Sequence, residues 1–253
     1  MFAHFPIAAL AVYAMKIGML FCSSSSWYRL IKKFGWLRPR KRLYPERPKI
    51  GLRASRINQY WHLDATLLRL CDGTKAFLQV VSDNFSKLVL AWSVSHEING
   101  VNTKELLLSA FKRATDLCGS IENPTVIADS GSENVNAEVY GLVKTGLFMI
   151  QIAQIDIQES NSAAEVIFRM AKHNYLFLQS LDTMSGFERH CRFYFGDYCN
   201  VIPHSALDGA TPMEVYTSKW GEQEKAALLE SAKRAIARRK EQNLSQSCGK
   251  FPF

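Results

Sequence analysis

The stretch YWHLDATLLRLCDGTKAFLQVVSDNFSKLVLAWSV, residues 60–94, decides the fold class. It holds three segments rich in apolar, aromatic and β-branched residues, and Asp72-Gly73 between the first two is a hairpin turn signal. Connections this short join antiparallel neighbours. The stretch therefore predicts three antiparallel strands, at Tyr60 to Leu70, Ala76 to Val81 and Leu88 to Val94.

Beyond this stretch the hydrophobic periodicity alternates between helix and strand. An alternation of this kind after three hairpin strands predicts an α/β fold in which a mixed sheet carries helices on its faces. A charged helix from Glu222 to Lys240 follows, for which a solvated helix is favoured over one that faces DNA. The other expected elements are helices at Thr103 to Cys118, Ala137 to Lys144 and Asn161 to Leu178, and strands at Thr125 to Ala128 and Leu147 to Ile152.

Basic residues exceed acidic ones by 31 to 23 in this chain of 253 residues, which gives a net charge of +8 and a pI near 9.2. Residues 28–56 carry eleven basic residues and one acidic residue, Glu46. The net positive charge of this strip is therefore larger than that of the whole chain. Pro39, Pro45 and Pro48 make the strip extended, because proline lacks an amide donor and restricts the residue before it. Such a linker can lie along a phosphate backbone, and nucleic acid is the expected partner.

Ahead of the linker, Ile7 to Met15 and Trp27 to Phe34 are expected to be helical, with N-caps for the second helix among Ser23 to Ser26. Two short helices around a turn that contains Gly18 are typical of a helix-turn-helix, and equally of a plain helical hairpin. The DNA-facing residues of the second helix would be Arg29, Lys32 and Lys33.

The six cysteines have no metal-ligand spacing and no accompanying histidine cluster, so neither a zinc site nor a disulfide framework is indicated. The apolar stretch from Phe5 to Cys22 is interrupted by Lys16 and Gly18 and has no basic segment before it. We therefore expect a cytoplasmic protein without a membrane partner.

Three acidic residues occupy positions that are unusual for a carboxylate. Asp64 lies among apolar residues in the middle of the first strand, where an unpaired charge is costly. Asp129 follows a buried strand at its carboxyl end, where open α/β sheets bind ligands. Glu165 lies early in the helix that is expected from Asn161 to Leu178. Each has a structural alternative: a basic partner for Asp64, a turn cap for Asp129, and an i,i+4 pair with Arg169 for Glu165. Gathered together, the three would repel unless a cation binds, and oxygen ligands suit Mg²⁺ or Mn²⁺.

The segments around these acids resemble the catalytic core of the retroviral-integrase and bacterial insertion-sequence transposase superfamily. That family has an Asp, Asp, Glu triad, and thirty-five residues commonly separate its last two members. Here residues 130–164, thirty-five in number, separate Asp129 from Glu165. The resemblance extends from about Trp27 to Tyr216. It is carried by Trp61-His62-Leu63-Asp64-Ala65-Thr66, Asp83-Asn84-Phe85-Ser86 with Leu90-Ala91-Trp92, Asp129-Ser130-Gly131-Ser132-Glu133-Asn134, Ser160-Asn161-Ser162 through Glu165 to Lys172-His173, and Asn200-Val201-Ile202-Pro203-His204-Ser205-Ala206-Leu207 with Thr211-Pro212.

The resemblance implies a ribonuclease-H-like five-stranded mixed sheet, with the two Asp on adjacent strands and the Glu on a helix. It also implies that Asp64, Asp129 and Glu165 are the catalytic residues and bind two Mg²⁺ (or Mn²⁺) ions. Lys172 matches a basic residue that faces DNA in relatives, although a solvated charge is the alternative. The expected DNA contacts are Arg29, Lys32, Lys33, Arg38, Arg40, Lys41, Arg42, Arg169 and Lys172.

The implied function is that of a DNA transposase or integrase, a DDE polynucleotidyl transferase that hydrolyses a phosphodiester and then transfers the free 3′-hydroxyl to target DNA. Its partners would be double-stranded DNA, as terminal repeats and target, and further copies of the chain. Two alternatives stay open: a hydrolysis-only nuclease of the same fold, and a decayed or domesticated DNA-binding regulator. The expected division is 1–36 helix-turn-helix remnant, 37–58 basic linker, 59–220 catalytic core, and 221–253 charged helix and tail.

Overall fold

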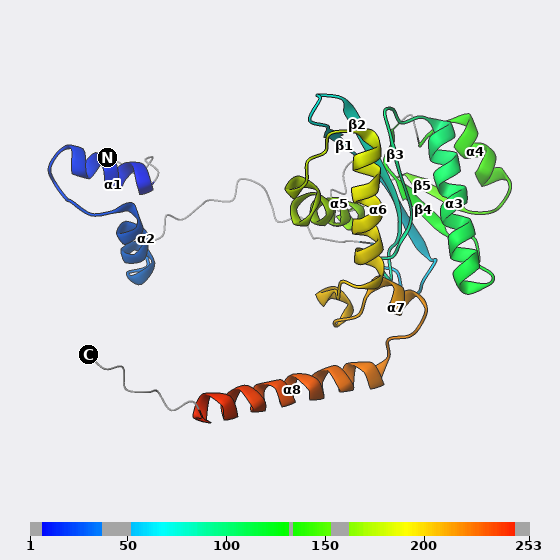
Figure 1. The fold of residues 1–253 in the computed structure, drawn as a ribbon. Helices are drawn as coiled ribbons and strands as arrows, with labels where there is room; N and C mark the ends of the chain where they lie inside the picture. The colour runs from blue at the N-terminus through cyan, green and yellow to red at the C-terminus, as the bar shows by residue number, and fades with distance from the viewer. Residues whose placement is uncertain (1–6, 37–51, 132–133, 153–161, 246–253) are drawn as a thin grey trace. The chain divides into compact units, whose positions relative to one another are not determined.

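The computed structural model describes residues 7–36, 52–131, 134–152 and 162–245. The chain forms two compact units, residues 1–48 and 49–253, and each is described by itself (Figure 1). The division between the two units, after residue 48, falls within the expected basic linker at 37–58, and the expected four-part division of the chain stays a prediction. The basic residues Arg38, Arg40, Lys41 and Arg42 lie outside the described residues.

The first unit contains a pair of helices, α1 (Ile7–Lys16) and α2 (Ser24–Lys33). The side chain of Ser23 caps α2 by accepting a hydrogen bond from the Ser26 amide, so the helix starts three residues earlier than expected. Only the small side chains of Ala11 and Ala14 are fully buried, and α2 buries none. The helix pair is confirmed, while its assignment as a helix-turn-helix remnant stays a prediction.

The second unit is built on a five-stranded mixed sheet with the strand order β3-β2-β1-β4-β5. The pairs β1·β2 and β2·β3 are antiparallel, and β1·β4 and β4·β5 are parallel. The turn between the first two strands forms as expected, because Gly73 adopts a φ of 84° and Asp72 accepts a hydrogen bond from the Thr74 amide. The strands are β1 (Tyr60–Arg69), β2 (Lys75–Asp83), β3 (Val89–Ser95), β4 (Thr125–Ala128) and β5 (Met149–Ile152).

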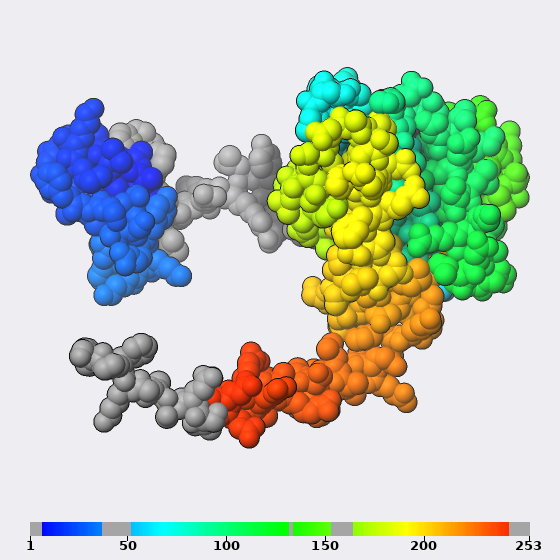
Figure 2. All heavy atoms as spheres, viewed as in Figure 1, coloured from blue at the N-terminus to red at the C-terminus, as the bar shows by residue number. Residues whose placement is uncertain are grey.

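Helices cover both faces of the sheet (Figure 1). One face packs against α3 (Gly100–Cys118), with α4 (Ala137–Lys144) beside that helix. The opposite face packs against α5 (Ser162–Asn174) and α6 (Met184–Asn200). Figure 2 shows the atoms of α5 and α6, yellow-green and yellow, as one continuous layer. The arrangement confirms the ribonuclease-H-like class of fold.

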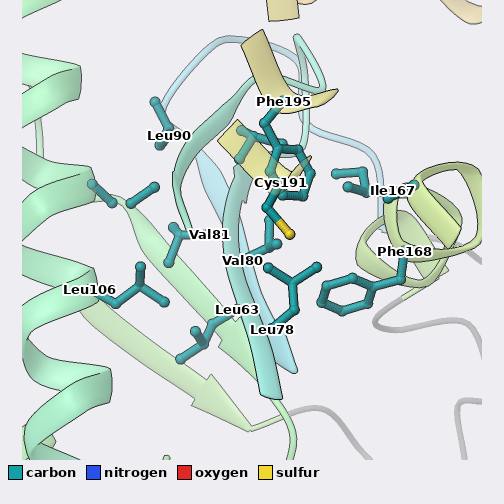
Figure 3. Packing of buried hydrophobic residues seen from close by; sticks show 14 of the residues in the cluster. Leu63, Leu78, Val80, Val81, Leu90, Leu106, Ile167, Phe168, Cys191 and Phe195 are labelled. Atoms are coloured by element: carbon teal, nitrogen blue, oxygen red, sulfur yellow. The ribbon is translucent and has the colours of Figure 1, made fainter. Parts of the chain in front are cut away.

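Alternation along the strands sends successive side chains to opposite faces, and this divides the core into two layers (Figure 3). Leu63 of β1 lies toward Leu106 of α3. Leu78 of β2 lies toward Ile167 and Phe168 of α5. Val80 lies two residues after Leu78 and therefore on the same face of β2. Residues directly across an antiparallel pair share a face, so Asp64, the partner of Val80, also lies on the face that α5 covers.

Two expectations along the second half of the chain were wrong. The third helix ends at Asn174 rather than Leu178, and Leu176–Leu178 form a separate 3₁₀ turn. The 17-residue helix α6 was not expected at all. Its apolar face is aromatic rather than aliphatic, with Phe187, Tyr194, Phe195 and Tyr198 buried among charged neighbours. The spacing of these buried residues is helical, but the charged residues between them made the hydrophobic periodicity hard to recognise in the sequence.

The C-terminal part of the second unit contains two more helices, α7 (Pro212–Tyr216) and α8 (Glu222–Ser245). A capping box between Thr211 and Glu214 starts α7. The side chains of α8 are exposed or half-buried as far as Gln242, which agrees with the solvated helix that was favoured. Within the described ranges, no helix is both long and apolar enough to cross a membrane.

Candidate active site

The first two carboxylates of the expected triad are brought together by the parallel pairing of β1 and β4. The register aligns Trp61 with Val126 and His62 with Ile127. Continued by two residues, this register sets Asp64 beside Asp129, which directly follows the last residue of β4. Neighbours in a parallel pair point to the same side, so both side chains belong to the face that α5 covers.

The third carboxylate comes from the first turn of α5. This helix buries Ala164, Ile167, Phe168 and Ala171 against the sheet, so the adjacent Glu165 lies at the margin of the buried stripe. Glu165 itself is exposed to solvent. The helix packs on β1 and β2, which carries Glu165 to the strand that holds Asp64.

The pKa of Asp64 depends on its burial and on the other two acids. Burial is the main cause that raises this pKa from its ordinary value of 3.8 to about 6, and the negative charges of Asp129 and Glu165 contribute to the rise. A hydrogen bond from the Ala65 amide, at 2.8 Å, and the charge of Lys172 act in the opposite direction. Asp64 is therefore a half-buried acid whose negative charge the surrounding residues do not fully compensate.

Asp129 is held by a side chain that received no role in the sequence analysis. Asn134 donates a hydrogen bond from Nδ2 to Asp129 Oδ1 at 2.5 Å, and the Gly131 amide donates to the same oxygen at 3.3 Å. The bond from Gly131 is the turn cap that was the structural alternative for Asp129. Asn134 had been quoted only as part of the family-like segment, and nothing in the sequence showed which acid it contacts.

Lys172 reaches the same site from the next turns of α5. Its Nζ donates a hydrogen bond to Thr66 Oγ1 at 2.5 Å, and Thr66 lies two residues beyond Asp64 on the same face of β1. Burial lowers the pKa of Lys172, and the charge of Asp64 partly offsets this. Among the described residues Lys172 forms no ion pair with any of the three acids, so it does not neutralise them as a fixed counter-ion.

The remaining expected contacts lie elsewhere. Arg169 is exposed on α5 and, within the part of the chain that is described, makes no ion pair with Glu165, so the i,i+4 alternative for Glu165 is not what the structure shows. Arg29, Lys32 and Lys33 are exposed or half-buried on α2 of the first unit. No structural finding tests whether any of them contacts DNA.

The donor chemistry fits a hard divalent cation. All three acids offer only oxygen, the ligand that Mg²⁺ and Mn²⁺ prefer. As they stand, no three His, Cys, Asp or Glu side chains among the described residues lie close enough to form a group that holds an ion. Like charges near one another repel, and a bound cation relieves that repulsion. The same repulsion contributes to the raised pKa of Asp64, so these residues fit a cation that would relieve it.

Comparisons with known proteins bear on the fold of this chain. No protein-family model matches the chain. Insertion element IS136 uncharacterized proteins from Agrobacterium fabrum and Agrobacterium tumefaciens are each 22% identical to it over 169 residues, covering 65% of this chain and 85% of the relative.

Solved structures show the same fold at low sequence identity. The HTLV-2 integrase catalytic core domain in complex with magnesium is 18% identical with a TM-score of 0.50, and the match covers 65% of this chain and 99% of that one. A chain in the structure of the simian T-cell lymphotropic virus intasome in complex with the PP2A regulatory subunit B56 gamma is 14% identical with a TM-score of 0.56, and the match covers 85% of this chain and 72% of that one. The chain therefore shares the fold of an integrase catalytic core domain.

Proposed function

We propose that this chain is a DNA transposase or integrase that cuts a phosphodiester and joins the resulting 3′-hydroxyl to target DNA, with two divalent ions bound by Asp64, Asp129 and Glu165. One observation supports the proposal: the parallel pairing of β1 and β4 sets Asp64 beside Asp129, and the charges of Asp129 and Glu165 both contribute to the raised pKa of Asp64. The insertion-element relatives support the same reading.

Each residue has a definite task in this reaction. Asp64 lies on the central strand β1, beside Asp129 at the end of β4. These two acids and Glu165 would hold the divalent ions. When bound, Mg²⁺ or Mn²⁺ would stabilise the charge that develops on the attacking and leaving oxygens. The protein needs no nucleophilic side chain, because a water and then the 3′-hydroxyl attack in turn.

Lys172 supplies positive charge at the edge of the acidic site. A lysine ammonium is a point charge that suits contact with a phosphate, and the bond to Thr66 holds it beside the strand that carries Asp64. Residues 28–56 would add affinity that does not depend on sequence, with a salt slope of about 0.9 for each phosphate neutralised on duplex DNA. Since two DNA ends must be held together, the active form would be a multimer, and its place would be the bacterial nucleoid.

The direct test measures nicking and joining of duplex DNA that carries the element ends, in the presence of Mg²⁺. Asp64→Asn and Glu165→Gln should each lower both rates by about 100-fold or more, since changing even the groups behind a metal ligand typically costs about 10- to 100-fold. Asp116→Asn is the matched control, because Asp116 is an exposed acid on α3 that faces away from the site. Full activity of Asp64→Asn would refute the proposal.

The same assay separates the alternatives. Nicking without joined product, at any target concentration, would favour a nuclease that only hydrolyses. Binding of Mg²⁺ and DNA with neither reaction would favour a decayed regulator.

A further inference from the structure

The side chain that holds Asp129 is almost wholly enclosed by protein. Asn134 is 5% exposed and lies five residues beyond Asp129, in the loop that joins β4 to α4. The amides of Asn134 and Val135 both donate to the Gly131 carbonyl at 3.0 Å, which folds the loop back over Asp129. Backbone bonds thus set the position of Asn134 before its side chain makes any contact.

The hydrogen bonds on Asp129 are unevenly distributed between its two oxygens. Asn134 Nδ2 and the Gly131 amide both donate to Oδ1, and no described donor reaches Oδ2. The orientation of the Asn134 amide is settled by chemistry, because a carboxylate accepts only and the reversed amide would present oxygen to oxygen. One oxygen of Asp129 is therefore fixed and the other is left for a ligand.

The contact with Asp129 leaves the other polar atom of the Asn134 side chain in an unfavourable environment. Its own Oδ1 is buried and has no hydrogen-bond partner in the described structure. A buried polar atom without a partner is destabilising, and such exceptions in folded proteins call for an explanation. A residue chosen only for packing would be apolar at this position, so the amide indicates a role for its donor.

We propose that Asn134 is a positioning residue that holds Asp129 in the orientation which offers Oδ2 to a divalent cation. The proposal rests on the assignment of Asp129 as a metal ligand under the proposed function. Asn134 touches neither substrate nor ion, and it acts only through the carboxylate. A hydrogen bond to the charged form of Asp129 also favours that form, which a cation requires.

The test is a calorimetric titration of the full chain with Mn²⁺ alone, without DNA. Asn134→Leu keeps the approximate volume and removes the donor, and Asn134→Ala serves as a second variant if the leucine distorts the loop. Each should raise the Kd for Mn²⁺ by about tenfold, which is the lower end of the effect for groups that orient a metal ligand. Nicking activity should recover as Mn²⁺ is raised, since the donor affects metal affinity and not the reaction itself.

Asn136→Ala is the matched control. Asn136 lies in the same loop and caps α4 through a bond from the Val139 amide, so its loss loosens the loop without touching Asp129. Its Kd for Mn²⁺ should stay within twofold of the wild type. If Asn136→Ala weakens Mn²⁺ binding as much as Asn134→Leu does, or if both Asn134 variants bind Mn²⁺ like the wild type, the positioning role is wrong.

This experiment also distinguishes the two proposals. In one outcome, Asp129→Asn abolishes Mn²⁺ binding and Asn134→Leu weakens it, but the protein neither nicks nor joins DNA. This result would support the positioning role of Asn134 and refute the proposed function. Activity that depends on Asp129 but metal affinity that is indifferent to Asn134 would do the reverse. A wild-type protein that binds no Mn²⁺ would overturn both.

Discussion

Two aspartates on neighbouring strands of the same sheet, Asp64 on β1 and Asp83 at the end of β2, have opposite surroundings. Burial raises the pKa of both carboxyls. Asp83 receives three hydrogen bonds, from the Asn58 amide at 2.8 Å and from the Ser86 amide and hydroxyl at 2.7 Å each. Asp64 receives one, from the Ala65 amide, and it is repelled by two other acids.

The difference teaches how to tell a structural acid from a functional one. The partners of Asp83 belong to a larger network, in which Asn58 accepts hydrogen bonds from Trp61 Nε1 at 3.1 Å and from the Tyr216 hydroxyl at 2.8 Å. This network connects the segment before β1 and helix α7 to the start of β1 and the end of β2, two inner strands of the sheet. Among the described residues, the Ala65 amide is the one hydrogen-bond donor to Asp64, so its carboxylate has capacity to accept a ligand.

The sharpest way to break this comparison is to remove each carboxylate. Asp83→Ala leaves the amides of Asn58 and Ser86 buried without an acceptor, so it should lower the free energy of unfolding by about 3 to 5 kcal/mol. Asp64→Ala should cause no comparable loss. Urea denaturation of the metal-free proteins measures both, and equal losses would show that the two sites do not differ in kind.

A second prediction concerns how the ionisation of Asp64 changes the stability of the folded protein. A folded-state pKa of about 6 against 3.8 means that the folded protein binds its proton more tightly, so stability falls as the pH rises from about 4 to about 6 and is constant above. At pH 7.5 without metal, Asp64→Asn should therefore raise the free energy of unfolding by up to about 3 kcal/mol.

The pH profile checks this result. At pH 3.5, where the wild-type carboxyl is protonated, the difference between Asp64→Asn and the wild type should vanish. A variant that is less stable than the wild type at pH 7.5 would show that Asp64 has a structural partner.

A third prediction uses the cation itself. A ligand that binds only the folded state stabilises it in proportion to the logarithm of its concentration, by about 2.7 kcal/mol at one hundred times the Kd. Mn²⁺ should therefore raise the melting temperature of the wild type and of Tyr216→Phe, and should leave Asp64→Asn unchanged. A shift of the same size in Asp64→Asn would place the cation elsewhere.

The smallest expected effect lies in the network around Asp83. Tyr216→Phe removes one of two hydrogen bonds to Asn58 Oδ1, so it should lower the free energy of unfolding by about 1 kcal/mol. The Mg²⁺ dependence of nicking should not change. A changed metal dependence would mean that the network and the acidic site are coupled.

Sequence patterns predicted the fold well where each element carries its own signal. The hairpin at Asp72-Gly73, the five strands and α3 were expected within a few residues of where they lie. The end of α5 was not, because apolar residues continue through Leu176 to Leu178 and the periodicity does not show where a helix turns into a 3₁₀ segment. Helix α6 was missed because its buried face is made of aromatic rings set among charges.

The site was predicted in part for a similar reason. Asp64, Asp129 and Glu165 were predicted from their unusual positions and from their resemblance to a known triad, and their catalytic role stays a prediction. The roles of Thr66 and Asn134 were not found, because each contacts a residue in another element or across a loop, and local periodicity carries no information on such pairs.

The amino-acid sequence by itself determined the order of strands and helices, the excess of basic charge in residues 28–56, and the three acids with their spacing. These features depend on local periodicity and on composition. Only the tertiary structure decided which acids meet and which are satisfied. Parallel pairing of β1 with β4 joins residues about sixty positions apart, and hydrogen-bond donors from separate segments saturate Asp83 while leaving Asp64 exposed to its neighbours' charge.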